Sequence, residues 1–372
     1  MPLIINEEQQ MLKQSAKDYV KDRSPVEALR KLRDSRDEKG FEPSVWRDMA
    51  EMGWASLTIP EDLGGLAFGY VGLGQILEET GRTLVASPLM STVVLGTTAI
   101  LEGGSDEQKA ALLPAIAEGS HLLALAIEES NAHRPWKVST TATASGSGYT
   151  LSGTKKFVLD GHVANTFILS ANTDKGLSIF LVPADASGVS VERHIMMDSR
   201  NAATVTLENV QVSGEAILGA EGDGKAILEK TLDVGRICLS AEMLGLTHEA
   251  FERTMNYLKE RKQFGVNIGS FQALQHRAAD MYCEIELCIS TVLKGLQMID
   301  EGADIREIAS LTKAKVGQVA QLVTNEAVQM FGGIGMTDDE EIGFFMKRAR
   351  VAQQTLGDAN YHMHRFAQLK GF

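Results

Sequence analysis

The chain of 372 residues is too long for one simple hydrophobic core and suits two or three domains. Its hydrophobic content of 44%, with only 8 prolines, is typical of a compact, helix-rich globular protein. The formal net charge of -13 disfavours nucleic acid and other polyanions as partners, because an acidic surface repels them.

Residues 1–120 have the pattern of a helical N-terminal domain. Amphipathic segments predict helices over 9–32, 45–52 and 70–81, each bounded by Gly or Pro. Ser105, with Glu and Gln in the turn that follows, predicts the capped start of a further helix. No signal-peptide pattern precedes these segments, and no apolar run in the chain reaches the ~18 residues that a membrane span requires. We therefore expect a cytoplasmic protein without a membrane partner.

Residues 121–215 change to an alternating period. Short runs such as LLALAIE, NTFILSA, LSIFLVP and ATVTLENVQV are rich in β-branched and aromatic residues and are separated by turn residues. They predict an antiparallel sheet domain. One β block between two helical blocks indicates an α+β fold and not a repeated βαβ unit.

Residues 216–372 return to the helical period and predict a four-helix bundle. The first helix is expected over 224–261, with Gly245 as a candidate break, and the second follows Ser270 as its N-cap. Further helices are expected over 305–331 and 359–369.

The three cysteines, Cys238, Cys283 and Cys288, lie on predicted helices without metal spacing, so we expect core residues in a reducing compartment. His362 and His364 are two apart on a predicted helix and face different ways, so no metal site is expected.

The segment from Arg261 to Gln275 reads R-x-x-F-G-x-x-I-x-x-F-Q-x-x-Q. An Arg at the end of a helix often serves only to balance the helix dipole, but a guanidinium also suits phosphate oxygens. The whole pattern resembles a signature of the acyl-CoA dehydrogenase family. The resemblance implies that Arg261, Phe264 and Gln272 help to hold the FAD pyrophosphate of a neighbouring subunit.

A second motif, QMFGGIGMT, begins at Gln329. A pair of glycines after a helix is commonly a C-cap and turn, although glycines also let backbone N–H groups approach a phosphate. The motif is similar to the family's Q-x-x-G-G-x-G pattern. By that resemblance Gln329, Gly332 and Gly333 would contact the ADP half of FAD across the dimer interface.

The resemblance covers the whole chain and implies the family's fold, with helical, β-sheet and four-helix-bundle domains in that order. It implies an oxidoreductase of lipid metabolism that dehydrogenates an acyl-CoA thioester at its α and β carbons. FAD would be the cofactor, an oligomer the assembly and electron-transfer flavoprotein the usual oxidant.

The positions that would supply the catalytic base depart from the family pattern. Most members place a Glu just before a Gly-Thr near the C-terminus, where this chain has Leu356; a minority use the Glu of a Glu-Arg pair, where it has Gly235. Asp358 is the nearest replacement. It is also a natural N-cap for the last helix, which is the interpretation that we favour.

The positions that would hold the flavin ring differ too. Two family threonines that hydrogen-bond the isoalloxazine are matched here by Ile127 and Leu159. The losses fall on the half of the site that holds the ring, whereas the retained motifs reach a neighbour's site. This asymmetry suggests a subunit that lacks the base and completes a partner's FAD site in an α2β2 assembly. The tail KRARVAQQTLGDANYHMHRF and the GGIGMT motif resemble the small subunits of heteromeric acyl-CoA dehydrogenases of the pimeloyl-CoA or steroid side-chain type.

Two other hypotheses remain open at this point. The first is a homomeric flavoenzyme, as a dimer or tetramer, that uses Asp358 as an unusual base. The second is a flavin-free scaffold or binding protein with the same fold.

Overall fold

The computed structural model describes residues 3–372, and their contacts divide the chain into two compact units. The helical unit contains the described residues of 1–31 together with 70–85 and 236–372. The sheet unit contains residues 32–69 and 86–235. Each unit is thus assembled from segments that are far apart in the sequence.

The N-terminal helices begin and end where local signals place them. Helix α1 (Glu7–Arg23) is capped by Asn6, whose Oδ1 accepts the Gln9 N–H at 2.8 Å. The single helix expected over 9–32 is wrong, because α2 (Val26–Ser35) is separate. Pro25 lies between the two helices, and proline both lacks an N–H and disfavours helical backbone in the residue before it. Helix α4 (Tyr70–Arg82) packs against α1.

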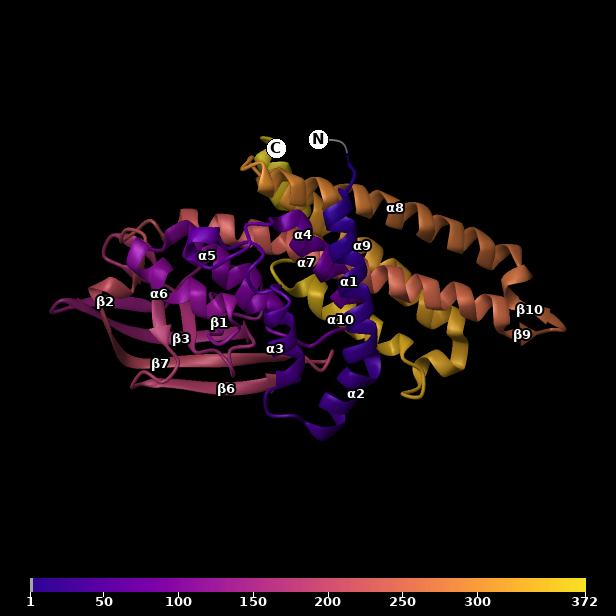
Figure 1. The fold of residues 1–372 in the computed structure, drawn as a ribbon, viewed down its shortest axis with the longest axis horizontal. Helices are drawn as coiled ribbons and strands as arrows, with labels where there is room; N and C mark the ends of the chain where they lie inside the picture. Colours follow the sequence, from indigo (N-terminus) through magenta and orange to yellow (C-terminus); the bar gives the residue numbers. More distant parts are fainter. Residues whose placement is uncertain (1–2) are drawn as a thin grey trace. The chain divides into compact units, whose positions relative to one another are not determined.

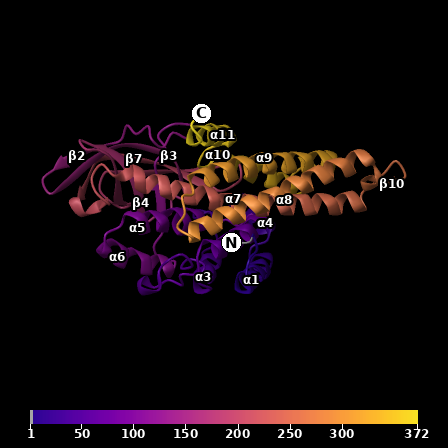
Figure 2. The same ribbon diagram turned by 90° about the horizontal axis from the view of Figure 1, so that it is seen from above.

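Five helices follow in the C-terminal part: α7 (Gly224–Glu260), α8 (Gln272–Asp300), α9 (Arg306–Phe331), α10 (Ile342–Gln354) and α11 (Ala359–Leu369). Helix α9 packs against α8, α10 and α11. Figures 1 and 2 show α7, α8 and α9 side by side, leading to the hairpin of β9 (Lys262–Gln263) and β10 (Val266–Asn267).

Two details of these helices correct the sequence expectations. Helix α7 does not break at Gly245, which instead allows a close approach to α4. A Cβ atom there would lie 1.8 Å from the Glu78 carbonyl oxygen, so only glycine fits. The N-cap of α8 is Phe271, because Ser270 belongs to a short 3₁₀ turn and its hydroxyl donates to the Asn267 carbonyl.

The sheet unit contains one eight-stranded sheet with the order β6-β7-β3-β2-β4-β5-β8, and β1 pairs with β4. Its strands are β1 (Leu123–Ala126), β2 (Thr141–Ser145), β3 (Gly148–Leu159), β4 (Thr166–Thr173), β5 (Gly176–Pro183), β6 (Val189–Ile195), β7 (Asn201–Ser213) and β8 (Ile217–Leu218). Most pairs are antiparallel, as predicted, but β4 pairs in parallel with β1 and, at one position, with β2.

Helices of the sheet unit lie beside this sheet. They are α3 (Pro43–Glu51), α5 (Thr97–Gly103) and α6 (Asp106–Ala117), together with a buried π-helix over Leu89–Gly96. Ser105 and Gln108 form the capping box expected at the start of α6. Figures 1 and 2 show α5 and α6 on one side of the sheet. The fold class predicted from the sequence is confirmed.

Cysteine positions and helix hydropathy complete the description. Cys238 and Cys288 are buried, but Cys283 is exposed, so the expectation of a core residue is wrong at that position. Over residues 3–372, no helix combines the length and the apolar character needed to cross a bilayer.

Candidate cofactor site and base position

Arg261 directly follows the end of α7, and its backbone is held on both sides. Its N–H donates to the Tyr257 carbonyl at 2.8 Å, and its carbonyl accepts the Ile268 N–H at 2.9 Å. Its side chain is exposed and forms no hydrogen bond or ion pair within the part of the chain that the structure describes. The Arg261 backbone is therefore fixed, and its guanidinium is available to an external anion.

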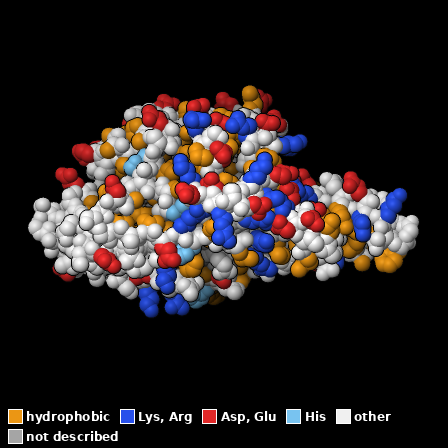
Figure 3. Space-filling model, turned by 90° about the horizontal axis from the view of Figure 1, so that it is seen from below, with side chains coloured by type: hydrophobic (Ala, Val, Ile, Leu, Met, Phe, Trp, Pro, Cys, Tyr) orange, Lys and Arg blue, Asp and Glu red, His pale blue; other side chains and the backbone are white. Residues whose placement is uncertain are grey.

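Phe264 stands at the turn of the hairpin after Arg261. Its φ of 55° is in the left-handed region, and 89% of its surface is exposed. Its ring centre lies 6.2 Å from that of Phe271, in an edge-on arrangement. Figure 3 shows hydrophobic side chains at the surface at this end of the helical unit. The two exposed rings together form an apolar patch, and such patches are typical of contact surfaces for another molecule.

The second motif lies at the end of α9. Gln329 is exposed, and its carbonyl accepts the Gly332 N–H, so the C-cap expected for the glycine pair is present. Gly332 has a φ of 68°, and a Cβ atom at Gly332 or Gly333 would meet nothing within 4 Å. Both glycines thus face open space, which leaves room for a phosphate or ribose to approach the backbone.

The structure brings the two motifs together through one contact. The Tyr257 hydroxyl donates to the Phe331 carbonyl at 3.2 Å, and the two rings are stacked with centres 4.3 Å apart. Tyr257 precedes Arg261 by one helical turn, and Phe331 directly precedes Gly332. Gln272, the first residue of α8, is exposed and follows the hairpin in the chain.

The position of the expected base lies between α10 and α11. Leu356 is buried with a φ of 60°, and its carbonyl accepts from Arg236 Nε at 3.2 Å and from His362 Nε2 at 3.0 Å. Arg236 and His362 are themselves buried. This position therefore presents a hydrocarbon side chain and a carbonyl that is already hydrogen-bonded to a cation.

A buried lysine, which the sequence did not indicate, completes this loop. Lys313 Nζ donates to the carbonyls of Ala352, Gln353 and Gly357, each at 3.0 Å. Burial, together with the nearby charge of Arg236, lowers the pKa of Lys313 to about 7. The loop is thus held by the side chains of Arg236 and Lys313, both of which bond to its backbone.

Asp358 is the N-cap of α11. Its Oδ1 atom accepts the Tyr361 N–H at 2.8 Å, which confirms the capping interpretation made from the sequence.

In the sheet unit, the positions matched to the flavin-binding threonines carry aliphatic side chains. Ile127 follows β1 and is 4% exposed, and Leu159 is half-buried at the end of β3. Neither side chain has a hydrogen-bond donor.

A polar cluster next to Ile127 was not anticipated. Glu129 accepts from Lys155 Nζ at 2.7 Å, from the Thr140 hydroxyl at 2.7 Å and from the Ser139 N–H at 2.6 Å. Although burial opposes its ionisation, these donors lower the pKa of Glu129 to about 2. Lys155 is fully buried, also donates to Ser170, and has a pKa lowered to about 8 by its burial. The carboxylate of Glu129 is therefore occupied by this chain's own donors.

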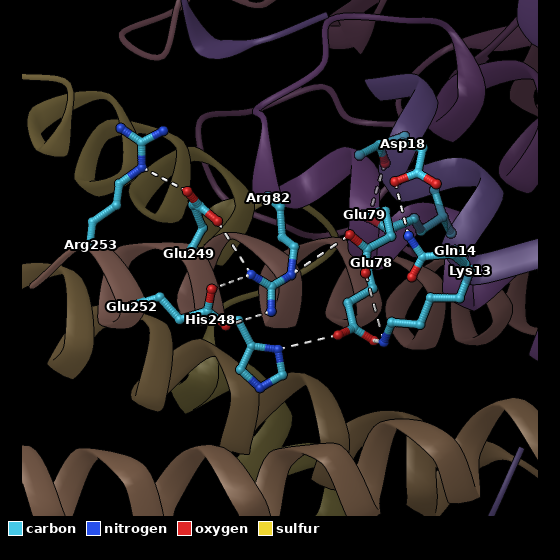
Figure 4. Close-up of polar contacts among 12 residues, drawn as sticks. Lys13, Gln14, Asp18, Glu78, Glu79, Arg82, His248, Glu249, Glu252 and Arg253 are labelled. Carbon is cyan, nitrogen blue, oxygen red and sulfur yellow. Dashed lines mark hydrogen bonds and ion pairs between the residues drawn. The ribbon is translucent and has the colours of Figure 1, made fainter. Parts of the chain in front are cut away.

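A second charged network joins α1, α4 and α7 in the helical unit (Figure 4). Its members are Lys13, Glu78, Glu79, Arg82, His248, Glu249, Glu252 and Arg253. Arg82 is its centre, since its guanidinium lies 3.3 Å from Glu249 and 2.9 Å from Glu252.

Three family models match the chain in succession. The acyl-CoA dehydrogenase N-terminal domain matches residues 6–120, the middle domain residues 124–210 and the C-terminal domain residues 222–369. The chain belongs to the acyl-CoA dehydrogenase family. The predicted enzyme class, an oxidoreductase acting on acyl-CoA with FAD as cofactor, is that of this family.

Individual known proteins resemble the chain along almost its full length. The short/branched chain specific acyl-CoA dehydrogenase of Bos taurus is 27% identical over 97% of this chain and 85% of its own. The Tcur3481–Tcur3483 steroid ACAD is 33% identical, with a TM-score of 0.90 over 98% of each chain. One chain of the ChsE4–ChsE5 complex of Mycobacterium tuberculosis is 25% identical to this chain, with a TM-score of 0.92. The match covers 100% of this chain and 99% of the chain in the complex.

Proposed function

We propose that this chain is the subunit of a heteromeric acyl-CoA dehydrogenase that completes the FAD site of a partner subunit and supplies no catalytic base. The observation that carries the proposal is that no side chain at the position of the catalytic base can accept a proton from the substrate. Leu356 occupies it, its carbonyl is bonded by Arg236, and Asp358 is used as a helix cap. Removal of an α proton requires a base that is positioned at the substrate, and the Asp358 carboxylate of this loop is already engaged as the helix cap.

The residues fit one half of FAD and not the other. Arg261 would pair with the pyrophosphate, while the open backbone at Gly332 and Gly333 would lie along the ADP half. Around this chain's own flavin-ring position, Ile127 and Leu159 would leave ring heteroatoms without donors. When bound, FAD accepts the substrate's β hydrogen as hydride. The partner would supply the ring contacts and the base.

Two of the similar solved structures support a heteromeric assembly, because each pairs two different proteins, Tcur3481 with Tcur3483 and ChsE4 with ChsE5. The remaining parts of the proposal follow from family membership. An acyl-CoA would be the substrate, electron-transfer flavoprotein the electron acceptor and the cytoplasm the location. The retained motifs would act in the site of an adjacent subunit, so the chain needs at least one other subunit. If that subunit is a second copy of the chain, the alternative assembly is a homodimer or homotetramer.

Flavin content tests the proposal directly. The absorbance spectrum of the chain purified alone is compared with that of the chain co-expressed with candidate partner dehydrogenases, and FAD is counted per chain. We expect no flavin in the chain alone and about one FAD per pair of chains together. One FAD per chain in the protein alone, with acyl-CoA turnover that Asp358→Asn abolishes, would instead establish the homomeric enzyme. No flavin under either condition would establish a scaffold or binding protein.

A further inference from the structure

We propose that Tyr257 and Arg253 of α7 are positioning residues that hold the glycine turn, Gly332–Met336, in register with Arg261. The inference rests on the proposed function, in which this end of the helical unit binds the ADP half of FAD. It concerns how two separate segments of the chain are made to act as one binding site.

The first step is the spacing along α7. Arg253, Tyr257 and Arg261 are each four residues apart, so successive members lie about one helical turn, ~6 Å, apart along one face. Arg261 lies one residue past the helix, but its N–H still bonds to the Tyr257 carbonyl. The helical hydrogen-bond pattern therefore extends one residue past α7, to Arg261.

The second step is the contact at the front of the glycine turn. Tyr257 both donates to the Phe331 carbonyl and stacks on the Phe331 ring, with an angle of 14° between the ring planes. Phe331 is the last residue of α9. The peptide group that enters the turn is thus fixed to α7 by a hydrogen bond and by an aromatic contact.

The third step is the contact behind the turn. Arg253 Nη1 donates to Glu341 Oε2 at 2.7 Å, and Glu341 directly precedes α10. The Arg253 guanidinium also lies over the Phe345 ring, 5.1 Å from its centre. Its Nε donates to Glu249, one turn earlier on α7, which orients the guanidinium. The segment that leaves the turn is therefore anchored to the same helix, one turn away from the front contact.

The turn itself has little packing of its own at its first two glycines. Nothing lies within 4 Å of a Cβ atom at Gly332 or Gly333, whereas Gly335 is buried against Phe331. The position of the open glycines thus depends on how the two ends of the turn are held. Anchoring the start of the turn at Phe331 and the following segment at Glu341 to α7 restricts where these backbone groups lie relative to Arg261 before a ligand binds. Such preorganisation favours a ligand that contacts both places, a dinucleotide diphosphate, over one that contacts neither.

The experiment uses the flavin-containing assembly as it is isolated, whether this chain alone or with its partner. Flavin is removed, and rebinding of FAD and of FMN, which lacks the ADP half, is followed by quenching of flavin fluorescence. The variants are Tyr257→Phe, which keeps the ring and removes the hydroxyl, and Glu341→Gln, which removes the charge facing Arg253. Glu307→Gln is the control, because Glu307 pairs with Lys370 near the opposite end of α9.

We expect Tyr257→Phe to weaken FAD binding about fivefold and Glu341→Gln about threefold, with FMN binding unchanged. A general loss of structure would weaken both flavins, so selectivity for FAD separates positioning from folding. Glu307→Gln should alter neither. A wild-type preference for FAD over FMN that both variants retain in full overturns this inference and leaves the proposed function standing. A wild-type assembly that rebinds the two flavins equally overturns the part of the proposed function that places the ADP half of FAD at this end of the helical unit.

Discussion

The carboxylates of Glu78 and Glu79 occupy successive positions on α4, yet their pKa values are displaced in opposite directions (Figure 4). Burial opposes ionisation of both. Glu78 overcomes it because His248 Nδ1 lies 3.2 Å and Lys13 Nζ 2.7 Å from its oxygens, which lowers its pKa to about 2. Burial raises the pKa of Glu79, and the nearby cations do not offset this effect. Arg82 and Lys13 approach the Glu79 carboxylate only to 3.8 and 3.9 Å.

Glu78→Gln should destabilise the protein at neutral pH. A carboxyl whose pKa falls on folding contributes stability above its unfolded pKa, and this contribution disappears as the pH falls through the folded value. We expect the free energy of unfolding to drop by roughly 2 kcal/mol at pH 7, with the difference from the wild type shrinking between pH 4.5 and about pH 2. Urea unfolding at a series of pH values measures it. An unchanged stability at pH 7 would show that the pairing with His248 and Lys13 contributes nothing net.

Glu79→Gln should have the opposite sign. A raised pKa means that the folded state binds the proton more tightly than the unfolded chain, so the ionised side chain opposes folding above its folded pKa. The neutral amide should therefore raise the free energy of unfolding at pH 7. The gain should shrink as the pH falls below the folded pKa, where the wild-type carboxyl is already neutral. The same urea series measures it, and a loss of stability at pH 7 would refute the argument.

Gly245→Ala tests the close contact between α7 and α4. In a helix without tertiary contacts, this change would be favourable by up to ~1 kcal/mol. Here the added Cβ would lie 1.8 Å from the Glu78 carbonyl oxygen, so the two helices must separate. We expect a net loss of roughly 2–3 kcal/mol, measured by thermal unfolding. Gly333→Ala is the matched control, since its Cβ meets nothing within 4 Å, and it should leave the midpoint unchanged.

Local signals in the sequence were sufficient for features whose cause is local. The bounds of α11 agree with the range predicted, because the Asp358 cap and the residues that it caps are adjacent in the chain. The capping box at the start of α6 is likewise contained within four residues. The glycine pair after α9 also behaves as its C-cap signal indicated.

Features whose cause is a distant contact were not predictable from the pattern. A glycine within a helical pattern predicts a possible break in the helix. The close approach of α4 explains why a glycine occupies position 245 in an unbroken helix. Lysine normally lies at the surface, but Lys313 is buried because three carbonyls more than 35 residues further along the chain satisfy its ammonium group. The parallel pairing of β1 with β4 is also a distant contact. The sequence of one strand alone does not determine which strand it pairs with or in which register.

Lys313→Met should loosen the loop at the base position. It removes the donor for three buried carbonyls, and we expect a loss of roughly 2–4 kcal/mol in the free energy of unfolding at pH 7. The lowered pKa of Lys313 adds a pH signature. Between about pH 7 and 10.5 the unfolded lysine binds a proton that the folded one does not, so wild-type stability rises with pH relative to the variant.

Equilibrium unfolding from pH 7 to 9.5 measures this widening gap, with Lys370→Met as the control because Lys370 lies at the exposed end of α11. A gap that stays constant with pH would contradict the assignment of the low pKa to Lys313.

Arg261→Ala should separate cofactor binding from folding. The side chain is exposed and has no polar partner within residues 3–372, so the unfolding midpoint of the chain should not change. In the flavin-containing assembly, loss of a charge-assisted bond to phosphate should weaken FAD binding by about 10-fold or more. Arg261→Lys should recover only part of it, because an ammonium lacks the two-pronged geometry of the guanidinium. Arg47→Ala, at another exposed arginine, should have no effect on FAD. Full retention of FAD by Arg261→Ala would remove Arg261 from the cofactor site.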